Sequence, residues 1–229
     1  MRAMILAAGE GRRMRPLTDS VPKPLLPLAG RPIIEHSLQK LVAAGVSQIV
    51  INVSWLGEQI VEYFGNGKRW GASIEWSREA TPLETAGAVV KALPLLGDEP
   101  FILINGDIWC DYPIENLAGR AAQLTPQQSA HLVMVDNPPH HPAGDFAITN
   151  GQLALPNNGG ALTFSGISVW RPQAFQSLPY SSTAPLPLRE VLLPLLSKGG
   201  VAGEYWQGQW CDIGTPERLA EINRKLSSD

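Results

Sequence analysis

The residue types best suited to chemistry lie in one polar segment near the N-terminus, residues 9–23, which follows an apolar run. Its two glycines, Gly9 and Gly11, leave backbone N–H groups open to an anion without side-chain obstruction. The two acidic residues of the segment are outnumbered by four basic ones, Arg12, Arg13, Arg15 and Lys23. This local positive excess in a chain of net charge −3 predicts a binding site for a polyphosphate.

Two well-known phosphate-binding patterns do not fit this segment. The dinucleotide fingerprint G-x-G-x-x-G would need a glycine where Met14 stands, and a P-loop would need a G-K-[ST] sequence that the chain lacks. The alternative interpretation is a surface turn with incidental arginines. The combination of a strand, glycines and prolines favours the phosphate loop.

A second group with chemical potential is Asn105-Gly106-Asp107, which follows the apolar run 101–104. Ligands of open α/β sheets bind beyond the carboxyl ends of the strands, so Asp107 is placed to face a bound phosphate. Mg²⁺ takes one or two carboxylates from a protein and its other ligands from substrate and water. Asp107 is therefore a candidate Mg²⁺ ligand, with a simple turn residue as the alternative.

The elements that must position these groups alternate between strand and helix in the first half of the chain. Apolar runs of strand length occur at residues 4–7, 49–53, 72–76 and 101–104. Helical spacing occurs between them, at residues 32–44, 57–64 and 85–93. This order predicts an α/β fold, with a Rossmann-like mixed and mostly parallel sheet and helices on both of its faces.

The pattern changes after residue 128 and indicates a small antiparallel subdomain. Strands are predicted at residues 130–135, 162–170 and 201–206. One helix is predicted at residues 188–196, where we expect Pro194 to interrupt or kink it. A closing helix is predicted at residues 215–226, with Thr215 as its N-cap.

Length and composition describe an ordinary globular chain. With 229 residues, of which 44% are hydrophobic and 17% charged, we expect one domain over residues 1–229. The net charge of −3 gives no reason to expect a nucleic-acid partner, and no run approaches the roughly 18 apolar residues of a membrane span. Cys110 and Cys211 form no metal or disulfide pattern, which favours reduced thiols and a cytoplasmic location.

Residues 9–24 resemble the signature of the sugar-1-phosphate nucleotidyltransferases, and the resemblance extends over nearly the whole chain. It implies a nucleotide-binding half at residues 1–128 and a sugar-binding half at residues 129–229. A glycine loop in this family wraps the nucleoside triphosphate, an arginine stabilises the leaving pyrophosphate and a lysine contacts phosphate. The resemblance assigns these roles to Gly9 and Gly11, to Arg12 and to Lys23.

The resemblance also implies the remaining site residues. Trp210 to Pro216 matches an element that carries a second metal ligand, here Asp212, for which a helix-capping role is the alternative. Catalytic residues are Arg12, Lys23 and Asp107, with Mg²⁺ as cofactor. The implied nucleotide-binding residues are Leu6, Ala7, Ala8, Gly9, Gly11, Arg12, Arg13, Lys23, Glu79, Thr85 and Ala86. Asn105, Gly144, Asp145 and Gly166 are implied near the sugar.

The predictions of the nucleotide base and of the sugar depend on fewer residues. Glu79 can only accept hydrogen bonds and so suits the donor edge of guanine, while Glu84 replaces the glycine that the family usually has. Chain length and motifs resemble instead the short bacterial uridylyltransferases that act on N-acetylmuramate α-1-phosphate in cell-wall recycling. The loop 155–160 lacks the acid found in larger relatives, which suits a sugar with its own carboxylate, although simple loop divergence is an equal alternative.

The resemblance therefore implies UMP transfer from UTP to a sugar 1-phosphate, with release of pyrophosphate and without a protein nucleophile. Mannose-1-phosphate guanylyl transfer and glucose-1-phosphate thymidylyl transfer are the alternatives within the family. A non-catalytic nucleotide-sugar sensor and a Rossmann oxidoreductase are alternatives outside it. His140 and His141 are expected in a solvated loop without a catalytic role. Oligomeric state is not predicted.

Overall fold

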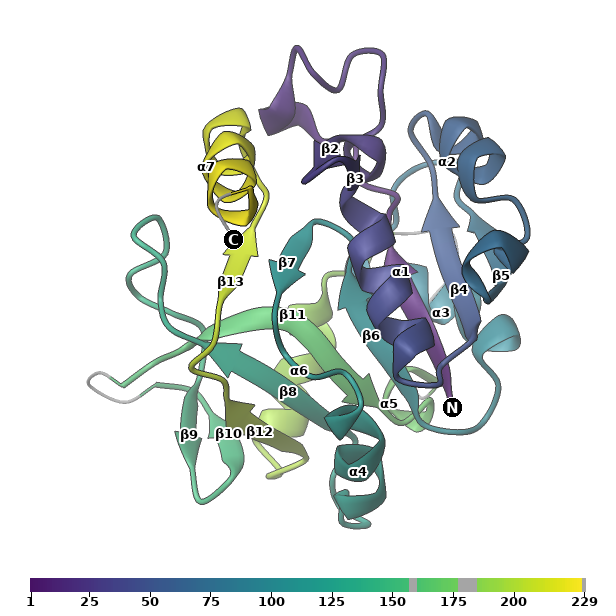
Figure 1. Ribbon diagram of the computed structural model, residues 1–229. Helices are drawn as coiled ribbons and strands as arrows, with labels where there is room; N and C mark the ends of the chain where they lie inside the picture. Colours follow the sequence, from purple (N-terminus) through teal and green to yellow (C-terminus); the bar gives the residue numbers. More distant parts are fainter. Residues whose placement is uncertain (157–159, 177–184, 228–229) are drawn as a thin grey trace.

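A large mixed sheet forms the centre of the computed structural model, which describes residues 1–156, 160–176 and 185–227 (Figure 1). Within these residues the sheet has nine strands. Their spatial order is β5 (Ser73–Arg78), β4 (Gln48–Val53), β1 (Arg2–Leu6), β6 (Phe101–Asn105), β11 (Thr163–Trp170), β8 (Ala130–Val135), β12 (Val201–Tyr205), β10 (Gln152–Ala154) and β9 (Ala147–Thr149). Strands β5 to β6 are parallel, whereas β11 runs antiparallel to both of its neighbours, β6 and β8.

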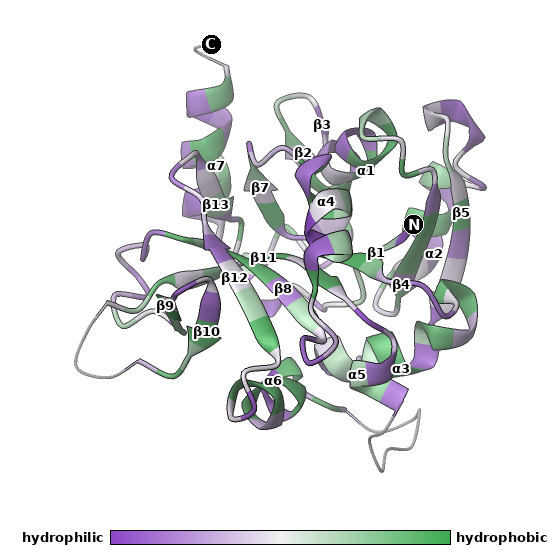
Figure 2. Ribbon diagram, turned by 90° about the horizontal axis from the view of Figure 1, so that it is seen from below, coloured by the Kyte–Doolittle hydropathy of each residue, from purple (hydrophilic) through white to green (hydrophobic). Residues whose placement is uncertain are grey.

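Helices cover both faces of the sheet (Figures 1 and 2). One face packs against α1 (Ile33–Ala43), α2 (Gly57–Phe64) and α4 (Asn116–Gln123). The other packs against α3 (Glu84–Leu96), α5 (Gln173–Gln176) and α6 (Leu188–Leu196). The predicted α/β class, with a Rossmann-like sheet between two helical layers, is confirmed.

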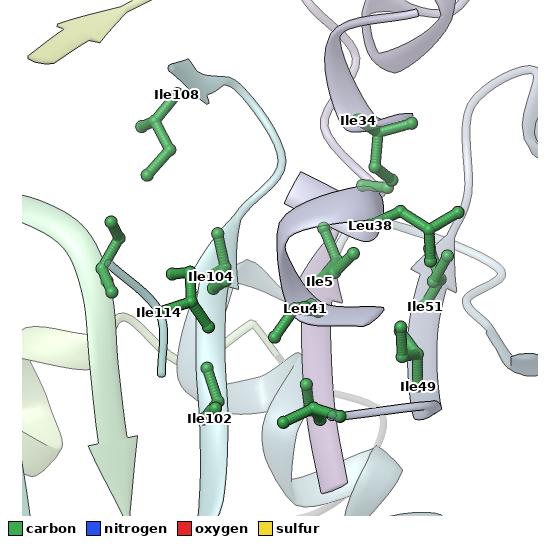
Figure 3. Close-up of a cluster of buried hydrophobic side chains, with 14 of the residues drawn as sticks. Ile5, Ile34, Leu38, Leu41, Ile49, Ile51, Ile102, Ile104, Ile108 and Ile114 are labelled. Carbon is green, nitrogen blue, oxygen red and sulfur yellow. The ribbon is translucent and has the colours of Figure 1, made fainter. Parts of the chain in front are cut away.

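Alternation along the central strands divides the core between these faces, because successive side chains of a strand point to opposite sides. In β1, Ile5 faces α1 while Met4 faces α3. Figure 3 shows Ile5 beside Leu38 and Leu41 of α1. Each such side chain, when fully buried, stabilises the fold by about 1.5–3 kcal/mol.

Two small sheets and the C-terminal helix complete the fold beside the carboxyl ends of the central strands. They are β2 (Pro27–Leu28) with β3 (Arg31–Pro32), β7 (Ile108–Cys110) with β13 (Trp210–Asp212), and α7 (Pro216–Leu226). A separate apolar cluster joins the N-terminal loop to α7 through Met14, Leu28, Ile33, Ile213, Leu219 and Ile222. The phosphate loop predicted from the sequence is thereby packed against the far end of the chain.

Most predicted elements are present, with shifted ends. Helix α1 begins at Ile33, after Pro32. Helix α6 continues through Pro194 as one element rather than being interrupted there, because the proline lies near the helix C-terminus and removes only one hydrogen bond. Helix α4 and the β7–β13 pair were not predicted. Among the described residues, no helix is both long and apolar enough to cross a membrane.

Candidate nucleotide site

An open cavity of about 440 Å³ lies at the carboxyl ends of the parallel strands. It brings together many residues that the sequence indicated: Leu6, Ala7, Ala8, Gly9, Gly11, Arg12, Arg13, Lys23, Glu79, Thr85, Asn105 and Asp107. It is also lined by residues that were not predicted: Met14, Pro24, Asn52, Pro82, Leu83, Glu84, Gly106 and Gly214. Ala86, Gly144, Asp145, Gly166 and Asp212 do not line it.

Gly11 is required at the turn of the loop for two reasons. First, its φ of 63° is in the left-handed region, a conformation that the Thr18 hydroxyl supports by donating a hydrogen bond of 2.9 Å to the Gly11 carbonyl. Second, a Cβ at this position would lie 2.9 Å from Thr18 Cγ2 and 3.1 Å from Lys23 Cβ. A side chain would therefore push the loop away from the lysine that the cavity needs.

The two arginines of the loop differ in their surroundings. Arg12 has a side chain that is 76% exposed and donates to Glu10 at 2.5 Å, and this hydrogen bond lowers the pKa of the Glu10 carboxyl. Arg13 reaches toward the turn before α7, where a Cβ on Gly214 would lie 3.2 Å from Arg13 Nη2. Both arginines line the cavity. A bound phosphate could pair with Arg13 directly, and it could pair with Arg12 by replacing Glu10 as the partner of that guanidinium.

Lys23 and Asp107 meet at the centre of the site. The Lys23 ammonium donates to Asp107 Oδ2 at 2.6 Å, and the lysine side chain is only 11% exposed, against 40% for Asp107. An ammonium group carries three donors, so this ion pair leaves two for phosphate oxygens. Because Lys23 is nearly buried, its charge is weakly screened and acts strongly on a bound anion.

Backbone pairing brings the Asp212 segment next to Asp107. In the β7–β13 pair Asp212 is opposite Ile108, and the N–H of Ile213 donates to the Asp107 carbonyl at 2.7 Å. The Asp212 carboxylate is held by Arg218 Nη1, which donates to its two oxygens at 2.7 and 2.6 Å. Thr215 caps α7, as predicted, so Asp212 itself is not the N-cap.

The two loop histidines contact carboxylates rather than only solvent. His140 Nε2 lies 3.0 Å from Asp212 Oδ1, and His141 Nε2 lies 3.0 Å from Asp145 Oδ1. The exposed fractions of 43% and 41% agree with a surface loop, but that loop reaches back to the site. Sequence reasoning missed the His140–Asp212 contact because it joins segments far apart in the chain, whereas His141 and Asp145 are only four positions apart.

Of the residues expected near the sugar, Asn105 lines the cavity and Gly166 packs against Asn105. A Cβ on Gly166 would be 2.7 Å from Asn105 Nδ2, so this glycine lies directly behind a lining residue. Asp145 accepts from the Phe164 N–H at 2.8 Å and contacts His141 with its other oxygen. Ala86 is fully buried and its N–H donates to Leu186 at 3.0 Å. Asp145 and Ala86 therefore have local partners within the protein.

Gly106 allows the close approach of strand β6 to the end of β1. Its N–H donates to the Leu6 carbonyl at 2.9 Å, and a Cβ at this position would lie 2.3 Å from that oxygen. We expect Gly106→Ala to destabilise the protein by roughly 1–3 kcal/mol and to displace Asp107, with loss of turnover. Urea denaturation and a rate assay measure both effects.

A matched control is Gly119→Ala in α4, where a Cβ meets nothing within 4 Å. Alanine is the better helix former, so this variant should be as stable as the parent or more stable by up to about 1 kcal/mol. Equal stability changes at the two glycines would contradict the steric account of Gly106.

Asn52 was missed by the sequence reasoning and connects two walls of the cavity. Its Oδ1 accepts from the Ala7 N–H at 2.8 Å, and its Nδ2 donates to Glu79 Oε1 at 2.8 Å. Glu79 Oε2 in turn accepts from the Leu83 N–H at 3.0 Å. The signal was a single polar residue within the apolar run 49–53, at the carboxyl end of a strand.

Burial raises the pKa of the Glu79 carboxyl, and the hydrogen bonds from Asn52 and Leu83 act in the opposite direction. We expect Glu79→Gln to cost about 1–3 kcal/mol, because the glutamine amide nitrogen must face the donor of either Asn52 or Leu83. Urea denaturation measures the change. A fully stable variant would show that the two hydrogen bonds are not needed to hold these walls together.

The fold and the cavity define a class of enzyme. A family model described as nucleotidyl transferase matches residues 2–229, and the chain therefore belongs to the nucleotidyl transferase family and is a nucleotidyltransferase. The N-acetylmuramate alpha-1-phosphate uridylyltransferase of Neisseria meningitidis serogroup B is 46% identical over 224 residues, which cover 96% of each chain. The mannose-1-phosphate guanyltransferase of Aspergillus oryzae is 30% identical over 95% of this chain, which spans 62% of that longer protein.

Solved structures share the fold at lower identity. A protein from Bacillus anthracis, described as a glucose-1-phosphate thymidylyltransferase in complex with a sucrose, superimposes with a TM-score of 0.87 at 22% identity. The match covers 100% of this chain and 96% of that one. HddC from Yersinia pseudotuberculosis, complexed with GMP-PN, gives a TM-score of 0.80 at 20% identity. The resemblance read from the sequence motifs is thus confirmed at the level of the family.

Proposed function

We propose that the chain transfers UMP from UTP to N-acetylmuramic acid α-1-phosphate, giving a UDP-sugar and pyrophosphate in cytoplasmic recycling of cell-wall sugars. The observation that best supports nucleotidyl transfer is that the glycine-arginine loop, Lys23 and Asp107 line one cavity. The choice of uracil and of this sugar is supported by the relative that is 46% identical over the full length. Two unpaired cysteines, Cys110 and Cys211, agree with a reducing compartment.

The proposed reaction is an in-line attack by a phosphate oxygen of the sugar 1-phosphate on the α-phosphorus of UTP. The new O–P bond forms as the bond to the pyrophosphate oxygen breaks, so the protein need supply no nucleophile. Backbone N–H groups at Gly9 and Gly11 and the charges of Arg13 and Lys23 hold the phosphates. Arg12 neutralises the charge that grows on the departing pyrophosphate.

The proposal includes a magnesium ion held by Asp107, with Asp212 as second ligand once its carboxylate exchanges its present partner Arg218 for the metal. Among the described residues, no group of three or more His, Cys, Asp or Glu side chains could hold a metal. Mg²⁺ is commonly bound by one or two carboxylates together with substrate phosphates, which is the donor set that Asp107 and its backbone neighbour Asp212 would offer. When bound, Mg²⁺ neutralises phosphate charge and polarises the reacting phosphoryl group.

Glu79 gives no reason to prefer guanine as the base, because its two oxygens accept hydrogen bonds from Asn52 and Leu83 within the protein.

The loop 155–160 lacks the acid found in larger relatives, but residues 157–159 of that loop lie outside the described residues. Support for the acidic sugar therefore comes from the full-length relative rather than from this loop.

The test is a pyrophosphate-release assay with UTP, GTP, dTTP and ATP against the 1-phosphates of N-acetylmuramic acid, N-acetylglucosamine, glucose and mannose. We expect the highest kcat/KM with UTP and the N-acetylmuramic acid derivative, and a rate that disappears when EDTA removes Mg²⁺. A preference for GTP with mannose 1-phosphate would replace the proposal by guanylyl transfer. Nucleotide binding without turnover in every combination would favour the sensor.

A further inference from the structure

Glu84 has an unusual backbone in the wall of the nucleotide cavity. Its φ is 58°, in the left-handed region that glycine adopts freely and other residues adopt at a cost. Among the described residues, three other non-glycine residues have a positive φ, namely Ala29, Leu56 and Asn150, and none of them lines the cavity. This backbone conformation explains why the family usually has a glycine at this position. A glutamate that accepts the backbone cost should therefore have a function of its own.

The Glu84 side chain is exposed, and Glu84 lines the same cavity as the cationic loop. The other glutamate that lines this cavity, Glu79, is buried and accepts from Asn52 and Leu83. Over residues 1–156, 160–176 and 185–227, no hydrogen bond or ion pair involves the Glu84 carboxylate. Glu84 therefore offers the cavity a charged acceptor that the described part of the protein does not use.

We propose that Glu84 binds the 2′-hydroxyl of the nucleotide ribose and so selects ribonucleotides over deoxyribonucleotides. The inference rests on the proposed function, in which Arg13 and Lys23 hold the phosphates and the nucleoside occupies the rest of the cavity that Glu84 lines. A carboxylate accepts only. The single donor of the uracil edge, N3–H, lies between two carbonyl oxygens that would repel a carboxylate, whereas the ribose hydroxyls are donors without such neighbours. A carboxylate on a ribose 2′-hydroxyl is also how other α/β nucleotide sites recognise ribose.

A purely structural role would have a different signature. Glu84 is the first residue of α3, where a negative charge interacts favourably with the helix dipole. Loss of that interaction would lower the melting temperature but would change UTP and dUTP binding by the same factor. The ratio of the two dissociation constants therefore separates ribose recognition from helix stabilisation.

The experiment is calorimetric titration of UTP and dUTP, each with Mg²⁺ and without sugar phosphate, into the parent chain, Glu84→Ala and Glu84→Gly. In the parent we expect UTP to bind about tenfold more tightly than dUTP, the size of one hydrogen bond to a charged group. Both variants should lower that ratio to near one. Glu84→Gly should also melt at a higher temperature than Glu84→Ala, because glycine relieves the backbone.

Each outcome decides the proposal. An unchanged ratio in Glu84→Ala would overturn it, and so would a ratio that falls only in Glu84→Gly, because backbone relaxation would then be the cause. Glu99→Ala, an exposed acid outside the cavity, serves as the charge control and should keep the parent ratio. Titration needs no turnover, so a wrong sugar leaves the result intact. If another base binds more tightly, its ribo and deoxy forms replace UTP and dUTP.

Discussion

Replacing Asp107 by asparagine is expected to lower kcat by about a thousandfold or more while the protein remains folded. Asp107 accepts from Lys23 at 2.6 Å and is the carboxylate of the central strand end that lines the cavity. Asparagine has nearly the same shape, so it fits the turn after Gly106. It carries no charge, and a neutral amide is a poor ligand for Mg²⁺ and a weak partner for the Lys23 ammonium.

Single-turnover rates across a magnesium titration, with far-ultraviolet circular dichroism and a melting curve, measure this effect. The matched control is Asp98→Asn, because Asp98 is exposed and outside the cavity. The control should keep the parent rate. Asp107→Asn should in addition bind Mn²⁺ more weakly than the parent. A rate close to that of the parent would remove Asp107 from the reacting groups and leave its ion pair with Lys23 as a structural feature.

The parts of the site that the sequence predicted are local in the chain. Gly9, Gly11, Arg12 and Lys23 lie within one short loop, and their residue types alone indicate an anion. Asp107 was predicted because it directly follows a buried strand, and strand ends of an open sheet face the ligand. The fold class followed in the same way from apolar runs whose spacing alternated between strand and helix.

The parts that the sequence did not predict depend on contacts between distant segments. Asn52 joins the ends of β1 and β5, and nothing in the residues around it tells which partners it meets. Arg218 and His140 converge on Asp212 from a helix and from a loop that are 78 positions apart. The positive φ of Glu84 was likewise hidden, because the sequence shows a departure from glycine without showing the backbone behind it.

Helix α4 was missed for a different reason. Only Leu117 and Ala121 of its residues are buried, and Gly119 in its middle is a poor helix former, so the segment has few apolar residues to mark a helix. Its stability comes instead from packing and from Arg120, which binds Glu204 of β12 with Nη2 at 2.5 Å and Nε at 3.0 Å. This polar contact leads to the second large effect, which concerns stability rather than turnover.

Glu204 is the centre of a polar network on the α4 face of the sheet. Its Oε1 accepts from the Tyr112 hydroxyl at 2.6 Å and lies 3.0 Å from His131 Nε2, while Arg120 bridges both oxygens. Burial alone would raise the pKa of this carboxyl, but the hydrogen bonds from His131, Arg120 and Tyr112 outweigh it and lower the pKa to about 2. The ionised form is therefore strongly favoured in the folded state.

We expect Glu204→Gln to destabilise the protein by up to about 3 kcal/mol at neutral pH, since each unit of pKa shift is worth about 1.4 kcal/mol. The sign follows from the lowered pKa. An unfolded glutamate titrates at about 4.5, so the carboxylate contributes fully above that pH and loses its contribution as the pH falls toward 2. The stability difference between parent and variant should shrink to less than half by about pH 3.

Urea denaturation of both proteins at a series of pH values from about 7 to 3 measures this difference, and midpoints should be compared only where the m-values agree. Glu62→Gln is the control, because Glu62 is exposed and outside the network, and its difference from the parent should be small at every pH. A large loss at Glu204 that stays constant with pH would assign it to packing and lost hydrogen bonds. A loss of stability that becomes smaller as the pH falls would assign the effect to the charge of Glu204. Protonation of the parent at low pH then removes the same negative charge that the glutamine substitution removes at neutral pH.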